Sequence, residues 1–194
     1  MKTCQGEGWP VLLSDSRNPK RKLRFTWELV HNGRCWIGIN THRANGLAAE
    51  AIAGGVISEL AGFTGLKREV PYGANSRIDI LLDNGTRQCY VEVKNVTLVD
   101  DMERYTFPDA VTTRGQKHLR ELERVVENGD RGVILFVIQR SDGATFIPAD
   151  TIDPEYGDLL RRVVAAGVEA LAYRADVLPT GIEIVESIPI DLSQ

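Results

Sequence analysis

The sequence has few of the features that mark secreted, zinc-binding or membrane-spanning proteins. Its 194 residues include only three cysteines, Cys4, Cys35 and Cys89, which are scattered and odd in number. They form neither a disulfide framework nor the paired spacing of a zinc site. No apolar run approaches the roughly 20 residues that span a bilayer, and the opening segment MKTCQGEGWP lacks the apolar region of a signal peptide. We therefore expect a cytoplasmic protein with no membrane attachment.

An excess of basic residues is also absent. Lys and Arg number 23 against 27 Asp and Glu, which gives a net charge of −4. This excludes a positive field over the whole molecule. Nucleic acid remains compatible with it, because basic groups can gather on one face and a metal ion can neutralise local carboxylates. The composition, 43% hydrophobic and 26% charged, is that of a globular protein of one normal domain plus a small one.

The chain divides into two regions with different sequence patterns. Residues 1–40 contain three short strand patterns, WPVLL, RFTWELV and CWIGIN. Three strands make a small core, so we interpret this region as a partial β-barrel domain. Residues 41–194 alternate helical and strand patterns in the order αβββαβαβ. This order predicts an α/β domain in which helices flank a mixed central sheet.

The α/β region carries recognisable start and stop signals. Asn45 is expected to cap a helix that extends to the region of Gly62, and Thr112 or Thr113 a second helix that stops at Gly129. The run GVILFVIQR is apolar throughout, as in a strand buried on both faces. The remaining predicted elements are strands at LKREVPY, RIDILL, CYVEVKNVTL and VEALAYRADV, and a helix around EYGDLLRRVVAAG.

A predicted hairpin brings charged residues together. The dipeptide Asn84-Gly85 favours a tight type I′ turn with a two-residue loop. Side chains alternate along each strand, so this register places Asp79, Glu92 and Lys94 on one face. The other face would carry only apolar side chains, from Ile78, Ile80, Val91 and Val93. A register slip of one residue would separate Asp79 from Glu92.

Phosphodiester cleavage is the chemistry that suits this set. Neighbouring carboxylates repel each other unless one is protonated or a cation lies between them. Mg²⁺, or Mn²⁺ in its place, is held by one or two carboxylates with water and substrate phosphate. A nearby lysine can orient the attacking water and stabilise developing negative charge. The alternative is a solvated strand face, because a Glu-x-Lys pair often occurs by chance.

Other residues are open to two interpretations. Glu50 lies in an Ala- and Gly-rich helix, either as a further carboxylate at the metal site or as an exposed helix glutamate, which its spacing alone favours. A basic run precedes Phe25 and Trp27, as in proteins that bind single strands by stacking and phosphate contacts, but it also suits a solvated loop. That run consists of Lys20, Arg21, Lys22 and Arg24.

The predicted helix that follows Thr113 adds further candidates. Arg114 and Lys117 lie near its N-terminus, where backbone N–H groups favour phosphate. Gln116, Lys117 and His118 point in successive directions, so they cannot all face one site.

Long strings of the sequence resemble one family. SRIDILL, YVEVKNVTL and FPDAVTTRGQKHLREL are similar to the sugar fermentation stimulation protein A family, as are NPKRKLRFTWELV, FIPADTIDPEYGDLLRR and VEALAYRADV. The resemblance covers nearly the whole chain. It implies an N-terminal OB-type β-barrel and a C-terminal restriction-endonuclease-like domain of the PD-(D/E)xK class. Family members carry more strands upstream and an Asn-Thr-Gly-Ser type segment, so the N-terminus is expected to be shortened.

The resemblance also implies roles for individual residues. Asp79 would be the motif aspartate, although SRID lacks the proline of the literal PD motif. Glu92 and Lys94 would form the (D/E)xK pair, and the carbonyl of Val93 would be a further metal ligand. The resemblance favours Glu50 as the helix glutamate of such nucleases. Additional site residues are expected on the later helix, at Gln116 and His118.

Three hypotheses follow from the sequence. The first is a DNA-binding protein with a Mg²⁺-dependent nuclease site, in which Asp79 and Glu92 hold the metal and Lys94 positions water. The second is a non-catalytic DNA-binding regulator of sugar (maltose) utilisation genes. The third is a protein-interaction module whose charged residues are merely solvated, and which has no metal dependence. The sequence leaves homo-oligomer formation open.

Overall fold

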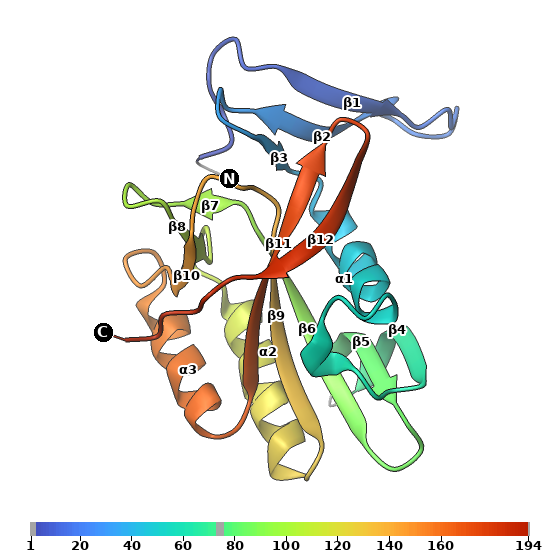
Figure 1. The fold of residues 1–194 in the computed structure, drawn as a ribbon, viewed down its shortest axis with the longest axis vertical. Coiled ribbons are helices and arrows are strands. Elements are labelled where there is room, and N and C mark those ends of the chain that lie inside the picture. The colour runs from blue at the N-terminus through green and yellow to red at the C-terminus, as the bar shows by residue number, and fades with distance from the viewer. Residues whose placement is uncertain (1–2, 73–75, 194) are drawn as a thin grey trace.

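A six-stranded mixed sheet forms the centre of the molecule (Figure 1) in the computed structural model, which describes residues 3–72 and 76–193. Its strand order is β12-β11-β9-β6-β5-β4. Neighbours β6, β9 and β11 are parallel, and the other pairs are antiparallel. The strands are β4 Gly65–Tyr72, β5 Ser76–Asp83, β6 Gln88–Val96, β9 Arg131–Ile138, β11 Glu169–Leu178 and β12 Gly181–Ser187. The predicted mixed α/β architecture is confirmed.

Helices cover both faces of this sheet. On one face, α1 (Ala44–Ala53) packs against Val133, Leu135 and Val137 of β9 and their neighbours. On the other face, α2 (Thr113–Glu127) and α3 (Pro154–Ala165) pack against the alternate residues of the same strand. Because β9 lies between two parallel neighbours and under helices on both sides, nearly all of its residues are buried. The continuous apolar run in the sequence predicted this position.

A small antiparallel sheet precedes the α/β body. It consists of β1 (Val11–Asp15), β2 (Phe25–His31) and β3 (Trp36–Gly38), in that order. Figure 1 shows it at the top of the molecule, away from β4 and β5. The amide of Gly38 donates to the carbonyl of Gln139 just after β9, over 2.9 Å. This contact joins the small sheet to the end of the central strand.

A third sheet lies on the side of the central sheet that α2 and α3 cover. Its order is β10-β8-β7, with β7 at Leu98–Val99, β8 at Arg104–Phe107 and β10 at Thr145–Pro148. The 3₁₀ segments η1 (Thr41–Arg43) and η2 (Ser58–Leu60) flank α1. Strands β8, β10 and β12 were not anticipated from the sequence. Within the described residues, no helix combines the length and apolar character that crossing a membrane requires.

Three local predictions were wrong. Asp83 pairs with Gln88, so the β5–β6 loop spans four residues rather than two. Asn40, not Asn45, provides the cap that starts the first helical segment, and α1 ends at Ala53 rather than near Gly62. Gly55 follows with a φ of 74°, which favours glycine and breaks the helix.

Candidate functional site

Pairing between strands is interrupted at Asp79. Among the described residues, the β5–β6 ladder ends at the pair Ile80–Val91, and the β4–β5 ladder passes over Asp79 and Glu69. The amide of Val93 donates to Asp79 Oδ2 over 2.8 Å. The Asp79 side chain therefore accepts a hydrogen bond from a backbone amide that would otherwise pair with a neighbouring strand.

Backbone strain occurs opposite this position. Glu69 has a φ of 54°, in the left-handed region that few residues other than glycine adopt. Ile78 packs with the α2 side of the sheet and Ile80 with the α1 side, so the expected regular alternation around Asp79 is wrong. Asn45 of α1 donates to Asp79 Oδ1 over 2.7 Å and to Glu69 Oε1 over 3.2 Å. One amide thus holds two carboxylates.

Glu92, Lys94 and His118 form the other half of the site. Glu92 is only 2% exposed, and Lys94 Nζ donates to its Oε1 over 2.7 Å. His118 Nδ1 contacts the same oxygen. Arg114 Nε donates to His118 Nε2 over 3.4 Å, and Lys94 Nζ lies 3.2 Å from His118 Nδ1.

The two carboxylates differ in their electrostatic environment. Burial and the negative charge of Glu92 raise the pKa of Asp79, against the opposing effect of the Val93 amide, Asn45 and Lys94. Burial also acts to raise the pKa of Glu92, but contacts with His118 and Lys94 outweigh it, and the pKa of Glu92 is lowered. A cation beside Asp79 would relieve the repulsion that raises its pKa.

Glu50 and Gln116 lie outside this constellation. Glu50 is exposed and lines a separate cavity of about 490 Å³ with Glu28 and Arg68. It follows Asn45 by five residues, which turns it about 140° around the helix from the residue that reaches Asp79. Gln116 is buried, and its amide donates to Asp153, the residue that caps α3, over 3.1 Å.

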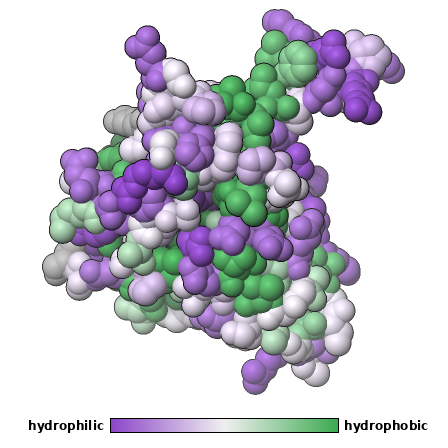
Figure 2. All heavy atoms as spheres, turned by 45° about the horizontal axis from the view of Figure 1, so that its top comes forward, coloured by the Kyte–Doolittle hydropathy of each residue, from purple (hydrophilic) through white to green (hydrophobic). Residues whose placement is uncertain are grey.

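The predicted basic residues fall into two groups. Lys20, Arg21, Lys22 and Arg24 are exposed between β1 and β2. Figure 2 shows apolar and strongly hydrophilic side chains next to one another on the projection at its upper right, which corresponds to this hairpin in Figure 1. Arg24 pairs with Asp15 and lies over the ring of Phe25 at 5.2 Å. Arg114 and Lys117 instead line a cavity of about 540 Å³ that also contains Asp79.

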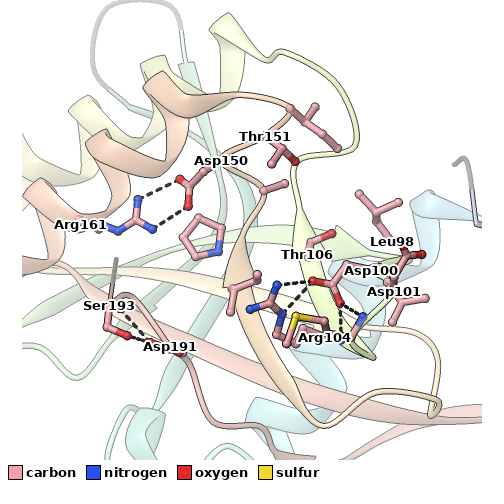
Figure 3. A pocket seen from close by; sticks show the side chains of 16 residues that line it. Leu98, Asp100, Asp101, Arg104, Thr106, Asp150, Thr151, Arg161, Asp191 and Ser193 are labelled. Atoms are coloured by element: carbon pink, nitrogen blue, oxygen red, sulfur yellow. Dashed lines mark hydrogen bonds and ion pairs between the residues drawn. The ribbon is translucent and has the colours of Figure 1, made fainter.

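A further cavity, of about 560 Å³, lies between the third sheet, α3 and the C-terminal segment (Figure 3). Both arginines that line it face carboxylates. Arg104 Nε donates to Asp100 over 2.8 Å, and Arg161 donates to both oxygens of Asp150 over 2.9 and 2.8 Å. The positive charge in this cavity is therefore already matched by acidic side chains.

Sequence reasoning missed three residues near Asp79. Asn45 was assigned to a helix cap, Glu69 was counted only within a strand, and Arg77 was not considered. The only available signal was the strand alternation that places Arg77 two positions before Asp79. Neither the left-handed conformation of Glu69 nor the reach of Asn45 from α1 has a sequence signature.

The chemistry of the residues at this site suits a divalent cation. Glu92 Oε2 is buried and has no hydrogen-bond partner, and the Asp79 carboxylate lies on the neighbouring strand. An orphaned carboxylate oxygen beside a second carboxylate is the arrangement that a hard cation satisfies. In the part of the chain that the structure describes, no three His, Cys, Asp or Glu side chains form a group that could hold a metal ion by themselves.

These features define a mixed α/β protein with a small N-terminal β-sheet and a buried carboxylate–lysine site. A family model described as "SfsA N-terminal OB domain" matches residues 1–39, and one described as "Sugar fermentation stimulation protein RE domain" matches residues 42–181. The chain belongs to the sugar fermentation stimulation protein family.

Individual relatives cover nearly the whole chain. The sugar fermentation stimulation protein homolog of Pelobacter propionicus is 57% identical over 192 residues, which are 99% of this chain and 83% of the relative. The homolog of Geobacter sulfurreducens is 57% identical over 190 residues, 98% of this chain and 81% of the relative. The solved structure of Pyrococcus furiosus SfsA in complex with Ca²⁺ matches with a TM-score of 0.83 and 26% identity, over 93% of this chain and 77% of that one.

Proposed function

We propose that this protein binds nucleic acid and cleaves phosphodiester bonds with the help of a divalent cation.

 The observation that carries this proposal is the convergence of Asp79, Glu92 and Lys94 at the point where the β5–β6 ladder opens. Two carboxylates and an ammonium group at one opening in an otherwise apolar sheet suit phosphoryl chemistry.

Asp79 and Glu92 would hold the cation. The carbonyl of Val93 is a third candidate ligand, because in a strand the N–H and C=O of one residue point to the same side, and the Val93 N–H points to Asp79. Mg²⁺ or Mn²⁺ in this position would offset charge on a phosphoryl oxygen and acidify water. The Ca²⁺ named with the structure of the P. furiosus relative supports a divalent cation in this family.

The chain's own residues have distinct roles in this proposal. The Lys94 ammonium, 13% exposed, would orient water and stabilise negative charge on the reacting phosphate. Asn45 and the Val93 amide fix the orientation of Asp79. His118 contacts the same oxygen of Glu92 as Lys94 does. Glu50 and Gln116 have no role here, because Glu50 lines another cavity and Gln116 bonds to Asp153.

The nucleic-acid surface would include the β1–β2 loop. Lys20, Arg21 and Lys22 supply exposed positive charge for phosphates. Phe25 and Trp27, 51% and 43% exposed, offer faces on which bases can stack. Arg24 contributes less charge, because Asp15 neutralises it.

A non-catalytic DNA-binding regulator is the second candidate. It is favoured by one observation: Lys94 and His118 both occupy Glu92 Oε1, so the ammonium is engaged by a carboxylate rather than free to face substrate. In that function the acidic pair would hold a structural cation or none. Cleavage distinguishes the two candidates, because only the first predicts it.

The test is calorimetric binding of Mg²⁺ and Mn²⁺, with cleavage of plasmid and single-stranded DNA measured on the same preparations. Wild type should bind metal and cleave, and Asp79→Ala/Glu92→Ala should do neither. Asp83→Ala, a carboxylate at the other end of β5, is the matched control and should retain both activities. Lys94→Ala should bind metal and lose cleavage about a hundredfold or more.

Other outcomes are equally informative. Metal binding without cleavage by wild type would favour the regulator. Equal cleavage by wild type and the double variant would assign the activity to a contaminant and remove the proposed nuclease.

A further inference from the structure

The cavity beside Asp79 has an acidic side and a basic side. Glu69 and Asp79, joined by Asn45, form the acidic side. Arg77, at the start of β5, and two cations of α2 line the same cavity. Its volume of about 540 Å³ lies in the range of small-ligand sites and is large enough for one nucleotide.

Helical spacing brings the α2 cations to this cavity. Arg114, Lys117 and His118 are separated by three and four residues, so they lie on one face of the helix. Gln116 lies on a different face, against Asp153. His118 contacts Glu92, so this face of α2 extends from the carboxylate site to the cavity.

The cationic side chains keep donors available. Arg77 Nη1 donates to the backbone carbonyl of Glu69 over 3.3 Å, and Arg114 Nε donates to His118 over 3.4 Å. The acceptors are a backbone carbonyl and an imidazole nitrogen, and within the described residues neither arginine forms an ion pair with a carboxylate. Lys117 lies 3.6 Å from Glu121 and is half exposed.

These available donors distinguish the cavity beside Asp79 from the cavity in Figure 3, where Asp100 and Asp150 neutralise both arginines. A guanidinium group with free N–H donors can bind two oxygens of one phosphate at once. The N-terminus of α2, which begins at Thr113, adds partial positive charge at the same place. A cation held by Asp79 would leave the three basic side chains as the dominant charge.

We propose that Arg77, Arg114 and Lys117 form a phosphate subsite, which holds a phosphate group of the nucleic-acid strand next to the bond that lies at Asp79 and Glu92. The proposal rests on the proposed function for the identity of its ligand, but its binding step needs neither metal nor cleavage. The phosphate comes either from a strand terminus or from within a strand. Both sources present the same chemistry to the arginines.

The experiment measures binding of a 3′-labelled short single-stranded oligonucleotide by fluorescence anisotropy in EDTA. The oligonucleotide carries a 5′-phosphate or a 5′-hydroxyl, and a circular single strand serves as an unlabelled competitor. Variants are Arg77→Ala, Arg114→Ala and Arg77→Lys. Arg87→Ala, an exposed arginine in the β5–β6 loop, is the matched control. Thermal unfolding checks that each variant is folded.

We expect Arg77→Ala and Arg114→Ala each to weaken binding about tenfold, the order of one lost hydrogen bond to a charged group. The slope of log affinity against log salt should fall by about 0.7 for each lost contact. Arg77→Lys should restore part of the affinity, and Arg87→Ala should change nothing. If the tenfold loss of affinity occurs only with the 5′-phosphorylated oligonucleotide, the subsite binds a terminal phosphate. If the circular strand competes as well as the linear one, the subsite binds an internal phosphate.

Failure of this proposal is distinguishable from failure of the nuclease. If Arg77→Ala and Arg114→Ala bind like Arg87→Ala, or if wild type binds none of these strands, the subsite is wrong, whatever the cleavage assay gives. If both variants lose affinity but wild type never cleaves, the subsite stands and the nuclease does not.

Discussion

The buried ion pair between Arg140 and Asp142 should dominate the attachment of the N-terminal sheet. Arg140 is 1% exposed and donates twice to Asp142, both over 2.6 Å. It also donates to the carbonyl of Thr97 over 2.6 Å and to Thr3 Oγ1 over 2.9 Å. Asn32, which follows β2, donates to Asp142 Oδ2 over 2.7 Å. One guanidinium therefore connects the N-terminal segment with the end of the central sheet.

Replacement of Arg140 by methionine keeps most of the volume but removes four hydrogen bonds. It leaves the buried Asp142 carboxylate with the hydrogen bond from the Asn32 amide but without the guanidinium. Loss of one partner from a buried pair costs about 3–5 kcal/mol. The matched control is Arg34→Met, because the Arg34–Glu103 pair has both side chains 60% exposed and should contribute little to stability.

Urea unfolding measures both values. Trp9, Trp27 and Trp36 all lie in the N-terminal region, so tryptophan fluorescence reports on that sheet, and far-ultraviolet circular dichroism reports on the helices of the body. In Arg140→Met the fluorescence transition should move to lower urea than the dichroism transition. A loss of stability in Arg140→Met no larger than that in Arg34→Met would refute the reasoning.

The same pair predicts an acid dependence. Burial acts to raise the pKa of Asp142, but the hydrogen bonds and charge of Arg140 outweigh it and lower the pKa to about 2. The unfolded chain has the ordinary pKa of 3.8, so the stabilisation is complete above about pH 4 and is lost as the pH falls toward 2. It corresponds to about 2 kcal/mol. Arg140→Met should lack this acid-linked loss.

Three further results are expected. Phe136→Ala should cost about 3–5 kcal/mol in urea unfolding, because this ring is fully buried in β9, and a loss under 1 kcal/mol would contradict the described packing. Thr112→Ala should cost about 1 kcal/mol, because its hydroxyl caps α2, whereas Thr113→Ala should cost less; equal losses would place the cap wrongly. Ca²⁺ at ten times its Kd should stabilise wild type by about 1.4 kcal/mol in thermal unfolding. Asp79→Asn should abolish that gain and Asp83→Asn should keep it, and an equal response of both would remove Asp79 from the metal site.

The proximity of Asp79 to Glu92 was predictable in spite of a wrong turn. The sequence suggested a two-residue loop, and the structure has four residues, which moves the pairing register by two. Because side chains repeat every two residues along a strand, this error leaves Ile80, Val91 and Val93 on one common face as predicted, whereas Ile78 lies on the other face. An error of one residue would have separated the two carboxylates.

Other features of the site had no local signature. Asn45 follows a 3₁₀ turn capped by Asn40, so it lies inside the helical segment and faces Asp79, whereas a helix that started at Asn45 would have used its side chain as a cap. Strand β12 is on the sheet edge with mostly exposed residues, and its pattern lacks the apolar run that identifies β9. Such edge strands form through their neighbours rather than through their own hydrophobicity.

The position of the site follows from where this sheet can tolerate irregularity. β9 is buried on both faces and paired on both sides, so an unpaired carboxylate there would be strongly destabilising. β5 lies one strand from the edge, where the β5–β6 ladder ends before Asp79, the β4–β5 ladder skips it, and Glu69 adopts a strained conformation. The opening lets backbone and side-chain donors turn toward one carboxylate, while the neighbouring β6 stays fixed to β9 and holds Glu92 and Lys94 in place. A rigid strand beside an opened one is therefore the structural basis on which this fold presents charged groups to a ligand.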